Sequence, residues 1–336
     1  MSSSFKCEVV RLGEIGKHPN ADSLGVLHVY GFQVITKLDE WHEGDLAVYI
    51  PPDSVVPDTE EYAWLEGHRR ITVRRFRGLY SMGLLVHAPE GMEPGDDAAE
   101  QLGIVHYEPE LKQMKNAYTA GDAETPPIGF RPRYDVEHYL RYASLFQPGE
   151  LVVCTEKIHG ANGRWTFQDD RYHAGSHNEW KKWDEAKPSI WWKVLRANPR
   201  VEDFLIRHPG TTLYGEVYGC VQDLRYGHKD GEVSVRFFDL WDGNQARFLN
   251  HDEAREVGAS HFGDELWVPE VYRGPADPEN LAILATGQST LSGADHYREG
   301  IVIKPPIERY VYDLGGGRLQ LKLVNPLYLE QSGKRS

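Results

Sequence analysis

The sequence predicts an α+β protein with two domains, of which the first is all-β and the second has antiparallel sheets. Its 336 residues exceed one ordinary domain and fall short of three. The first hundred residues are short apolar runs separated by turns. After a stretch rich in Pro, Gly and acids at 88–129, strand-like runs alternate with segments of helical spacing. We expect a first domain at 1–103, a linker at 104–135 and a second domain at 136–336.

In the first domain, runs of Val, Ile, Leu and Tyr alternate with turn residues such as Lys17-His18-Pro19-Asn20. Many short strands at this spacing favour a small barrel or sandwich. The predicted strands lie at 8–12, 23–30, 31–36, 45–50, 71–73 and 83–87.

In the second domain, apolar residues such as Ile190, Val194 and Leu205 recur at helical spacing and predict one or two helices over 187–208. Two more helices are expected at 252–257 and 278–287. Predicted strands lie at 151–155, 162–168, 212–217, 233–240, 300–304 and 318–324. Strands grouped this way indicate antiparallel sheets.

The composition excludes several classes of protein. Hydrophobic residues make up 40% and aromatic residues 11%, enough for a substantial core. No stretch approaches the roughly 20 apolar residues of a membrane span, and residues 1–16 lack the apolar block of a secretory signal. The three cysteines stand too far apart for a disulfide framework or a CxxC zinc site. We therefore expect a soluble, cytoplasmic protein. Its net charge of −14 argues against a histone-like nucleic-acid binder, but not against a local basic patch.

The segment 154–163, Cys-Thr-Glu-Lys-Ile-His-Gly-Ala-Asn-Gly, runs from an apolar strand into a charged pair, a histidine and a glycine. A free lysine has a pKa of about 10.4, so Lys157 is a nucleophile only if its surroundings release the amine proton. Gly160 would permit a close backbone approach to a ligand. Taken alone, this segment is equally consistent with a strand that ends in a polar turn.

Four further motifs follow in order. Glu216 lies in an apolar strand between two glycines, Phe238 lies in an aromatic strand, 299–304 reads Glu-Gly-Ile-Val-Ile-Lys, and Lys322 lies in a final strand. With Lys157-x-x-Gly160, they resemble the ordered motifs of the covalent nucleotidyltransferases, the superfamily of polynucleotide ligases and messenger-RNA capping enzymes. The resemblance covers residues 157 to 322.

Two features indicate the branch of that superfamily. The form K-x-H-G-x-N at Lys157, His159, Gly160 and Asn162 resembles the RNA-editing and phage RNA-repair ligases. Those relatives add a C-terminal domain, whereas only fourteen residues follow Lys322 here (336 − 322) and about a hundred precede the second domain. That arrangement resembles the Deinococcus-type RNA ligases. The implied fold is an N-terminal β-barrel (OB-fold) plus a C-terminal nucleotidyltransferase domain, the ATP-grasp-like ligase adenylyltransferase, with antiparallel sheets.

The first domain carries its own resemblance. Residues 18–24, His-Pro-Asn-Ala-Asp-Ser-Leu, are similar to the H-P-x-A-D-x-L signature of the tRNA-binding OB-fold, and 71–85 are similar to a later strand pair of that fold. Beside them lie the candidate nucleic-acid-binding residues Arg69, Arg70, Arg74, Arg75 and Arg77. Such a row suits a phosphate backbone. The alternative is a basic strand that pairs with the protein's own acids.

The resemblance implies an ATP-dependent RNA ligase that joins 3′-OH and 5′-phosphate ends through lysyl-AMP and an AMP-capped strand. It makes Lys157 the nucleophile, Phe238 the adenine-stacking ring and Lys322 the partner of the α-phosphate. Glu299 and Glu216 would bind Mg²⁺ or Mn²⁺. The implied ATP-binding residues are Glu156, Lys157, His159, Gly160, Asn162, Glu216, Phe238, Lys304 and Lys322.

The chain departs from the family pattern at Gln320, where a lysine is common, and at His177, where an arginine is common. Lys304 is a candidate substitute for the missing lysine. Alternatives to an RNA ligase are a DNA nick ligase, a capping guanylyltransferase that uses GTP, and an RNA-binding protein without activity. The expected partners are ATP and RNA, including nicked duplex or RNA/DNA hybrid, with no membrane and a monomer as the default.

Overall fold

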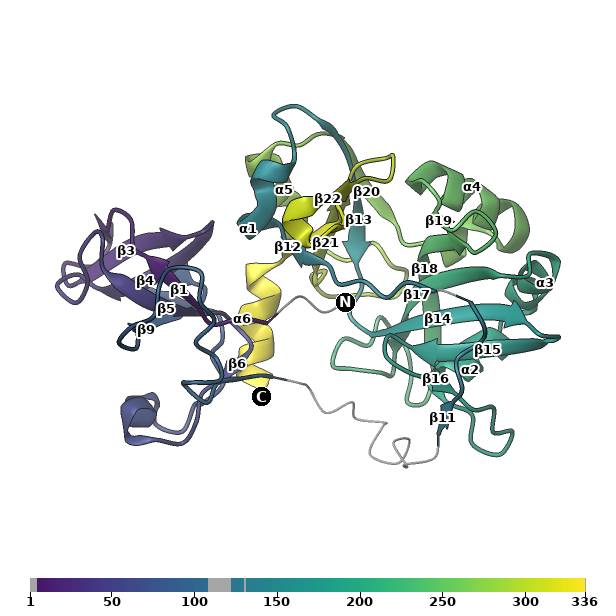
Figure 1. Ribbon diagram of the computed structural model, residues 1–336, viewed down its shortest axis with the longest axis horizontal. Coiled ribbons are helices and arrows are strands. Elements are labelled where there is room, and N and C mark those ends of the chain that lie inside the picture. Colours follow the sequence, from purple (N-terminus) through teal and green to yellow (C-terminus); the bar gives the residue numbers. More distant parts are fainter. Residues whose placement is uncertain (1–4, 108–121, 130, 336) are drawn as a thin grey trace. The chain divides into compact units, whose positions relative to one another are not determined.

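The computed structural model describes residues 5–107, 122–129 and 131–335, which belong to two compact units (Figure 1). The C-terminal unit contains 110–139 and 143–325. The N-terminal unit contains 3–109, 140–142 and 326–336. The last two segments were expected in the second domain. They belong to the N-terminal unit because their residues pack there: Arg141 pairs with Glu8, and Glu330 pairs with Arg75 at 3.2 Å.

The described part of 3–109 consists of short antiparallel strands and the short helix η1 (Glu60–Leu65), and the C-terminal helix α6 (Pro326–Arg335) belongs to the same unit. The strands are β1 (Glu8–Arg11), β2 (Gly16–Lys17), β3 (Leu24–Val29), β4 (Phe32–Lys37), β5 (Leu46–Ile50), β6 (Ser54–Val55), β7 (Arg74–Phe76), β8 (Leu79–Ser81), β9 (Leu84–His87) and β10 (Val105–His106). They pair as β1-β5-β9, β2-β3-β4, β6-β10 and β7-β8. Five of the six predicted strands are found, whereas 71–73 is not a strand and β7 begins only at Arg74. Over residues 5–107 the ladders stay separate, and no closed barrel is found.

Packing between the ladders follows the alternation of side chains along β1 and β5. Val9 and Val48 face one apolar cluster, whereas Val10 and Ala47 face another that includes Leu27 of β3. Successive residues of a strand point to opposite faces, so one short sheet fills two cores. Side-chain packing therefore joins ladders that strand pairing leaves separate.

The C-terminal unit contains two larger sheets, in which only the β12–β24 pair is parallel. The seven-stranded sheet has the order β11 (Ala123–Glu124), β16 (Trp180–Lys181), β15 (Arg171–Ser176), β14 (Ala161–Gln168), β17 (Thr211–Gly219), β18 (Val233–Asp242) and β19 (Arg247–Phe248). The five-stranded sheet has the order β12 (Glu137–His138), β24 (Leu321–Val324), β21 (Gly300–Lys304), β13 (Leu151–Lys157) and β20 (Glu270–Pro275). A hairpin of β22 (Tyr310–Val311) and β23 (Gly317–Arg318) precedes β24.

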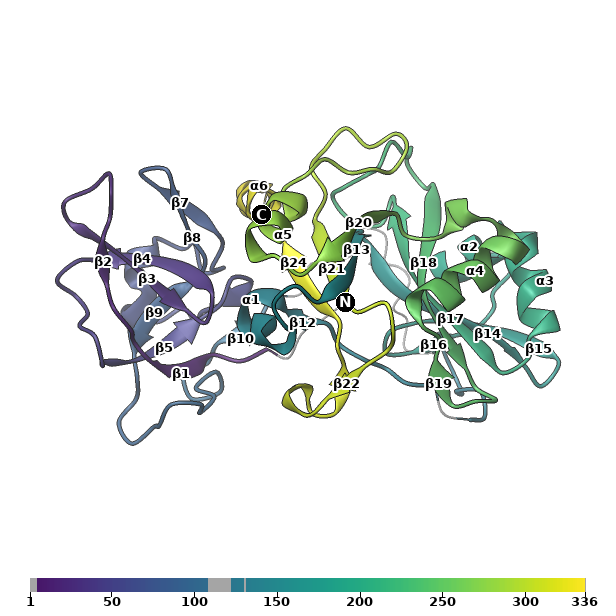
Figure 2. The same ribbon diagram turned by 90° about the horizontal axis from the view of Figure 1, so that it is seen from above.

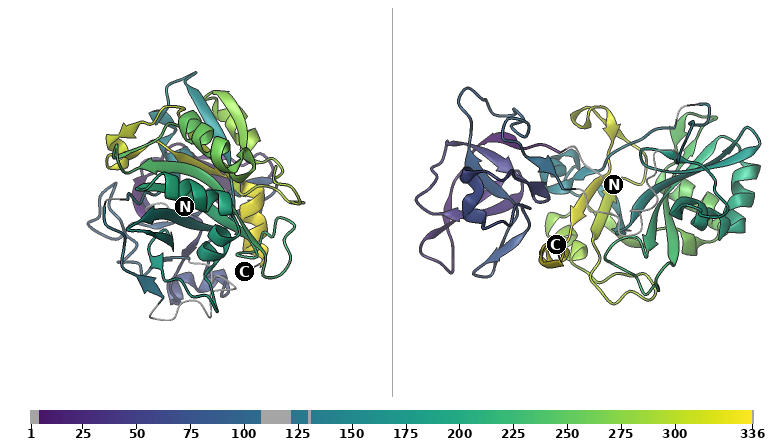
Figure 3. Two further views of the ribbon diagram at one scale, coloured as in Figure 1. Left: turned by 90° about the vertical axis from the view of Figure 1, so that its right-hand side faces the viewer. Right: turned by 90° about the horizontal axis from the view of Figure 1, so that it is seen from below.

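Helices cover the seven-stranded sheet (Figure 2 and Figure 3). The predicted helical stretch 187–208 is two helices, α2 (Ile190–Arg196) and α3 (Pro199–Arg207). Pro199 lacks the amide hydrogen that a continuous helix would need and instead starts the second helix. The helix expected at 252–257 is the longer α4 (His251–Phe262), and that at 278–287 is α5 (Pro278–Ala285).

The remaining helices of the described residues are α1 (Tyr139–Tyr142), α6 (Pro326–Arg335) and the short η3 (Ala143–Leu145), η4 (Asp264–Leu266) and η5 (Tyr312–Leu314). In the described part of the chain, no helix has the length and apolar character of a membrane span.

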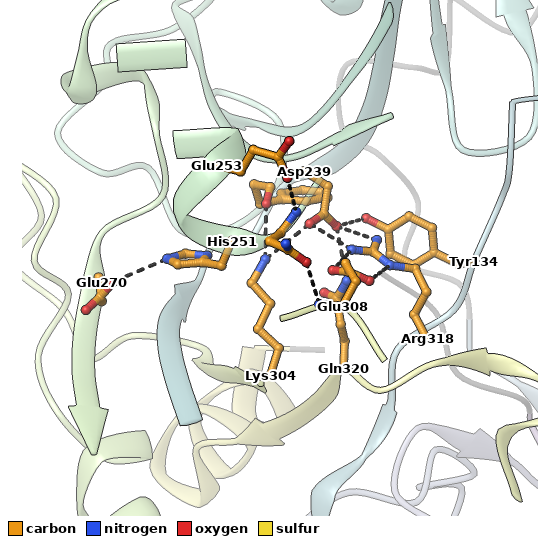
Figure 4. A network of polar contacts seen from close by, with 11 residues as sticks. Tyr134, Asp239, His251, Glu253, Glu270, Lys304, Glu308, Arg318 and Gln320 are labelled. Atoms are coloured by element: carbon orange, nitrogen blue, oxygen red, sulfur yellow. Dashed lines mark hydrogen bonds and ion pairs between the residues drawn. The ribbon is translucent and has the colours of Figure 1, made fainter. Parts of the chain in front are cut away.

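One buried carboxylate joins the two sheets (Figure 4). Asp239 of β18 accepts hydrogen bonds from Lys304 of β21 at 3.1 Å and from Arg318 at 2.8 and 3.2 Å. It also accepts a bond from Gln320 at 3.2 Å and one from Tyr134. Burial alone would raise the pKa of Asp239, but Arg318 and Lys304 outweigh it and hold the pKa well below its usual value. The group is therefore ionised and ties β18 to the segments around β21 and β24.

Asp239→Asn should destabilise the protein by about 3–5 kcal/mol, because it leaves two buried cations without their shared anion. Chemical denaturation at neutral pH measures this. The depressed pKa also means that the wild type loses this contribution as acid protonates Asp239, starting below about pH 5. The difference in the free energy of unfolding between wild type and variant should therefore shrink at low pH.

The matched control is Asp230→Asn, which removes an exposed partner of Arg225 and should cost less than about 1 kcal/mol. Equal stability of the two variants would contradict the role of Asp239.

Candidate functional site

A buried ion pair lies where β13 and β21 run side by side. Lys157, the last residue of β13, is 7% exposed, and its Nζ lies 2.5 Å from Oε1 of Glu299. The antiparallel register places Lys157 opposite Gly300, so the residue before β21 reaches the lysine. A Cβ on Gly300 would lie 2.2 Å from the carbonyl oxygen of Leu323, so only glycine lets β24 approach at this point. The sequence motifs at 157 and 299 thus meet in space.

His159 extends this pair into a chain of charges. Its Nε2 lies 2.6 Å from Oδ1 of Asp223, and its Nδ1 lies 3.6 Å from Oε2 of Glu299. Burial would lower the pKa of His159, but the two carboxylates outweigh it and raise the pKa to about 9. Burial would likewise raise the pKa of Glu299, but Lys157 and His159 hold it well below its usual value. Glu299 thus lies between Lys157 and His159, and Asp223 pairs with the other nitrogen of the His159 ring.

The segment after β17 holds this motif in place. Gln222 donates a hydrogen bond to the carbonyl oxygen of Gly160, and the backbone N–H of His159 donates to the Tyr226 hydroxyl at 2.8 Å. A Cβ on Gly160 would lie 2.1 Å from the carbonyl oxygen of Val217. Glycine is therefore required here by the approach of β17. The sequence analysis attributed it to a ligand and missed Gln222, Asp223 and Tyr226, which carry no motif of their own.

A small cavity of about 10 Å³ opens beside this chain of charges. Four of the predicted ATP-binding residues line it: Glu156, Glu216, Phe238 and Lys304. Gln320 lines it as well, so the residue that departs from the family pattern lies in the wall with Lys304. Room for about one water is far less than a purine needs, so a nucleotide would have to displace side chains.

Lys322 lies on β24, opposite Val302 of β21 and His138 of β12. Desolvation and, after it, the nearby Lys157 lower the pKa of Lys322 to about 8. Burial and then Lys322 lower the pKa of His138 to about 3, so that ring is neutral. Two lysines therefore approach the same carboxylate, Glu299, and the sequence analysis had not singled out His138.

Several oxygens at the site have no hydrogen-bond partner within the described residues: Oδ1 of Asn162, Oε2 of Glu216 and Oε2 of Glu299. Asn162 and Glu216 are paired opposite each other on β14 and β17. Burial raises the pKa of Glu216. Buried oxygen acceptors without donors are the ligand type that Mg²⁺ and Mn²⁺ prefer, so these residues fit a divalent cation.

Another group of three potential metal ligands consists of His251, Asp252 and Glu270, whose ligand atoms lie within 4.8 Å of one another. Arg273 bridges its two carboxylates, at 2.5 Å from Asp252 and 2.8 Å from Glu270. The Arg273 guanidinium thus occupies the position between the carboxylates that a metal ion would need.

His177, where the family pattern commonly has an arginine, follows β15 and lies 3.8 Å from Asp135, and burial lowers its pKa. A cationic group that the sequence analysis missed surrounds it. Burial lowers the pKa of Arg164 to about 10, and Arg133 and Arg131 lower it in the same direction. These arginines are close enough to repel one another, which is a feature of anion sites.

In the N-terminal unit, the five candidate arginines divide into two groups. Arg69 donates to the carbonyl oxygen of Val56 at 2.9 Å, and Arg70 pairs with Asp53 at 2.7 Å, so both are used within the unit. The remaining three belong to the β7–β8 hairpin, where Arg74, Arg75 and Arg77 are exposed. Arg75 lies 4.5 Å from the centre of the Tyr80 ring. The side chains of Arg74 and Arg77 make no hydrogen bond or ion pair to any residue that the structure describes.

Comparisons with known proteins agree with this architecture. A family model for RNA ligase matches residues 150–324, and a model for an OB-fold domain matches residues 7–87. The sequence matches no curated protein.

Among solved structures, the chain is similar to Naegleria gruberi RNA ligase. A mutant of that enzyme with AMP and Mn is 23% identical and has a TM-score of 0.80, covering 96% of this chain and 98% of that one. A second mutant, with ATP and Mn, is 22% identical over the same shares with a TM-score of 0.79. The enzyme with PPi is 23% identical and has a TM-score of 0.77, covering 99% of this chain and all of that one.

The solved structures establish the ligase fold, in which a small β domain precedes a mixed α/β domain. The family model spans more than half of the sequence and includes the residues of the buried ion pair, Lys157 and Glu299. The chain belongs to the RNA ligase family.

Proposed function

We propose that this protein is an ATP-dependent RNA ligase that joins a 3′-OH to a 5′-phosphate through lysyl-AMP and an AMP-capped strand. One observation carries the proposal: the buried Lys157–Glu299 pair stands beside a cavity walled by Glu156, Glu216 and Phe238. Adenylyl transfer needs a nucleophilic amine near a site with an aromatic ring and carboxylates, and Lys157 lies between Glu156 and Ile158, which both line the cavity.

In the first step, Nζ of Lys157 attacks the α-phosphate of ATP. A P–N bond forms, and the bond to the bridging oxygen breaks to release pyrophosphate. The attacking amine must be neutral, whereas Glu299 pairs with it as an ammonium. The nucleotide complex must therefore draw Glu299 away, and the ammonium proton must pass to solvent before the P–N bond forms. Lys322, next to the same carboxylate, is placed to offset charge on the α-phosphate.

Glu299, Glu216 and Asn162 would hold a divalent cation, because each keeps a buried oxygen that accepts no hydrogen bond from the described residues. When bound, Mg²⁺ or Mn²⁺ would neutralise phosphate charge. Arg131, Arg133 and Arg164 would bind other phosphates of the substrates.

In the later steps, AMP passes from Lys157 to the 5′-phosphate of an RNA strand, and the 3′-OH of a second strand then displaces it. Both steps need a bound polynucleotide. The N-terminal unit, proposed as an OB-fold barrel, would bind it through Arg74, Arg75 and Arg77 of the β7–β8 hairpin.

Incubation with ATP labelled at the α-phosphate should label the wild type in a metal-dependent reaction, and a chelator should prevent it. Lys157→Ala should abolish the label, because it removes the attacking amine. Lys193→Ala, an exposed lysine of α2, should keep it and serves as the control. Denaturing gels detect the adduct. Label from GTP in place of ATP would indicate a capping enzyme, and an undiminished label on Lys157→Ala would refute the assignment.

Replacing Arg74 and Arg77 with Ala should weaken RNA binding and leave labelling of Lys157 intact. If each arginine contacts a phosphate, the slope of log affinity against log salt should fall by about 0.7 to 0.9 for each arginine removed. Binding titrations at several salt concentrations measure the slope. Arg200→Ala replaces an exposed arginine of α3 in the other unit, removes one charge as each of the two replacements does, and should leave the slope unchanged. An unchanged slope in the double variant would remove the hairpin from the RNA site.

A further inference from the structure

The loop at residues 18–24, similar in sequence to a signature of the tRNA-binding OB-fold, has no part in the mechanism proposed above. In the structure it contacts the turn of the β7–β8 hairpin, which carries the arginines proposed to bind RNA (Figure 2). His18 is 2% exposed, and its Nε2 lies 3.1 Å from the carbonyl oxygen of Phe76. The side-chain amide of Asn20 donates to the carbonyl oxygen of Arg77 at 3.1 Å. Two residues of the loop thus hold two successive carbonyl groups of the hairpin.

Hydrogen bonds fix both the orientation and the tautomer of the His18 ring. The backbone N–H of Asn20 donates to Nδ1 of His18 at 3.0 Å, so Nδ1 carries no proton. The proton of the neutral ring is therefore on Nε2, which donates to the carbonyl oxygen of Phe76. The loop also closes on itself, since the backbone N–H of His18 donates to the carbonyl oxygen of Leu24 at 2.9 Å. Because the ring is buried and both nitrogens are occupied, His18 can hold the turn but cannot contact RNA.

The hairpin needs support at its turn. Within the residues that the structure describes, β7 pairs with β8 alone, and all three of its residues are exposed. A hairpin of two strands is only marginally stable in water. Its turn has positive φ at both positions, 46° at Arg77 and 101° at Gly78, a backbone that suits glycine but is unfavourable for arginine. On the other strand, the Gln33 side chain of β4 donates to the carbonyl oxygen of Tyr80 at 2.6 Å. The loop therefore supports the strand and the turn that bear the arginines.

We propose that His18 and Asn20 are positioning residues for RNA binding, which hold the β7–β8 turn so that Arg74 and Arg77 stay in place for the phosphates of a polynucleotide. This inference rests on the proposed function, because it concerns the arginines through which the N-terminal unit would bind RNA. An arginine on a fraying hairpin loses more conformational entropy when it binds a phosphate, so its contribution to affinity falls. Arginines on a turn that is already held lose less.

The test is a double-mutant cycle on RNA affinity, with a fluorescent RNA duplex that contains one nick and the same strand unpaired as probes. His18→Phe keeps a buried ring but removes both ring hydrogen bonds, and it should weaken RNA binding about fivefold or more. In the Arg74→Ala, Arg77→Ala background it should have almost no further effect, because the cations that it positions are gone. A mere loss of stability would lower the affinity alike with and without the arginines. His18→Gln keeps a donor toward Phe76 and should retain most of the binding.

The matched control is Ser54→Ala in the same unit. Ser54 is fully buried, and its hydroxyl donates to the carbonyl oxygen of Pro51 at 2.7 Å, so this variant also loses a buried bond from a side chain to the backbone. It should keep the wild-type affinity for RNA. The inference is overturned if folded His18→Phe binds RNA as the wild type does, or if its effect is the same without Arg74 and Arg77.

Should His18→Phe fail to fold, Asn20→Ala decides, because Asn20 is exposed and its replacement leaves the core unchanged. Its effect should likewise vanish in the Arg74→Ala, Arg77→Ala background. An effect that persists there would indicate direct contact with RNA and contradict a positioning role. If the double arginine variant binds RNA as well as the wild type, or the wild type binds neither probe, the proposed RNA site fails and this inference falls with it. Labelling of Lys157 by ATP, which these variants should leave unchanged, reports separately on the proposed ligase chemistry.

Discussion

The buried contact between Lys157 and Glu299 is the constraint on which the rest of the site depends. Two opposite charges inside a protein cost several kcal/mol to desolvate and are stable only when their geometry is held closely. Neighbouring strands supply that geometry here, because the β13–β21 register places Lys157 beside the start of β21. His159 and Asp223 then continue the alternation of charge outward. An apolar pair would be simpler to bury, so the cost indicates a role in chemistry.

The buried charges around Asp239 differ from those around Glu299, because they have a structural role. Asp239 has a partner for both of its oxygens from Lys304, Arg318, Gln320 and Tyr134, and it joins the two sheets. At the site, one oxygen of Glu299 and one of Glu216 have no hydrogen-bond partner in the described residues. Saturated acceptors stabilise a fold, whereas buried unsatisfied acceptors are kept for a ligand. The two networks meet at the cavity wall, where Lys304 lies.

The sequence predicted those strands and site residues that depend on neighbouring residues or belong to a motif. The strands that bear Glu216 and Phe238 were expected where they occur, since their apolar runs are unambiguous, whereas the strand predicted at 151–155 extends to Lys157. The contacts of Asp223 and Tyr226 with His159 were missed, because each joins residues more than sixty positions apart and neither residue belongs to a motif. The split of 187–208 at Pro199 could have been predicted, since the proline was visible. The return of 326–336 to the N-terminal unit could not, because it depends on tertiary packing.

The most direct test of the central claim separates lysine adenylylation from strand joining. Lys157→Ala should fail to join RNA that carries a 5′-phosphate when ATP is supplied, because no lysyl-AMP forms. It should still join RNA that already carries the AMP cap, without ATP, because the remaining site is intact. Sealing assays on the two substrates with variant and wild type measure this. A variant that joins both substrates would contradict the account, since Lys157 would then not be the residue that accepts AMP. A folded variant that joins neither would contradict it too, since Lys157 would then be needed after the AMP cap has formed.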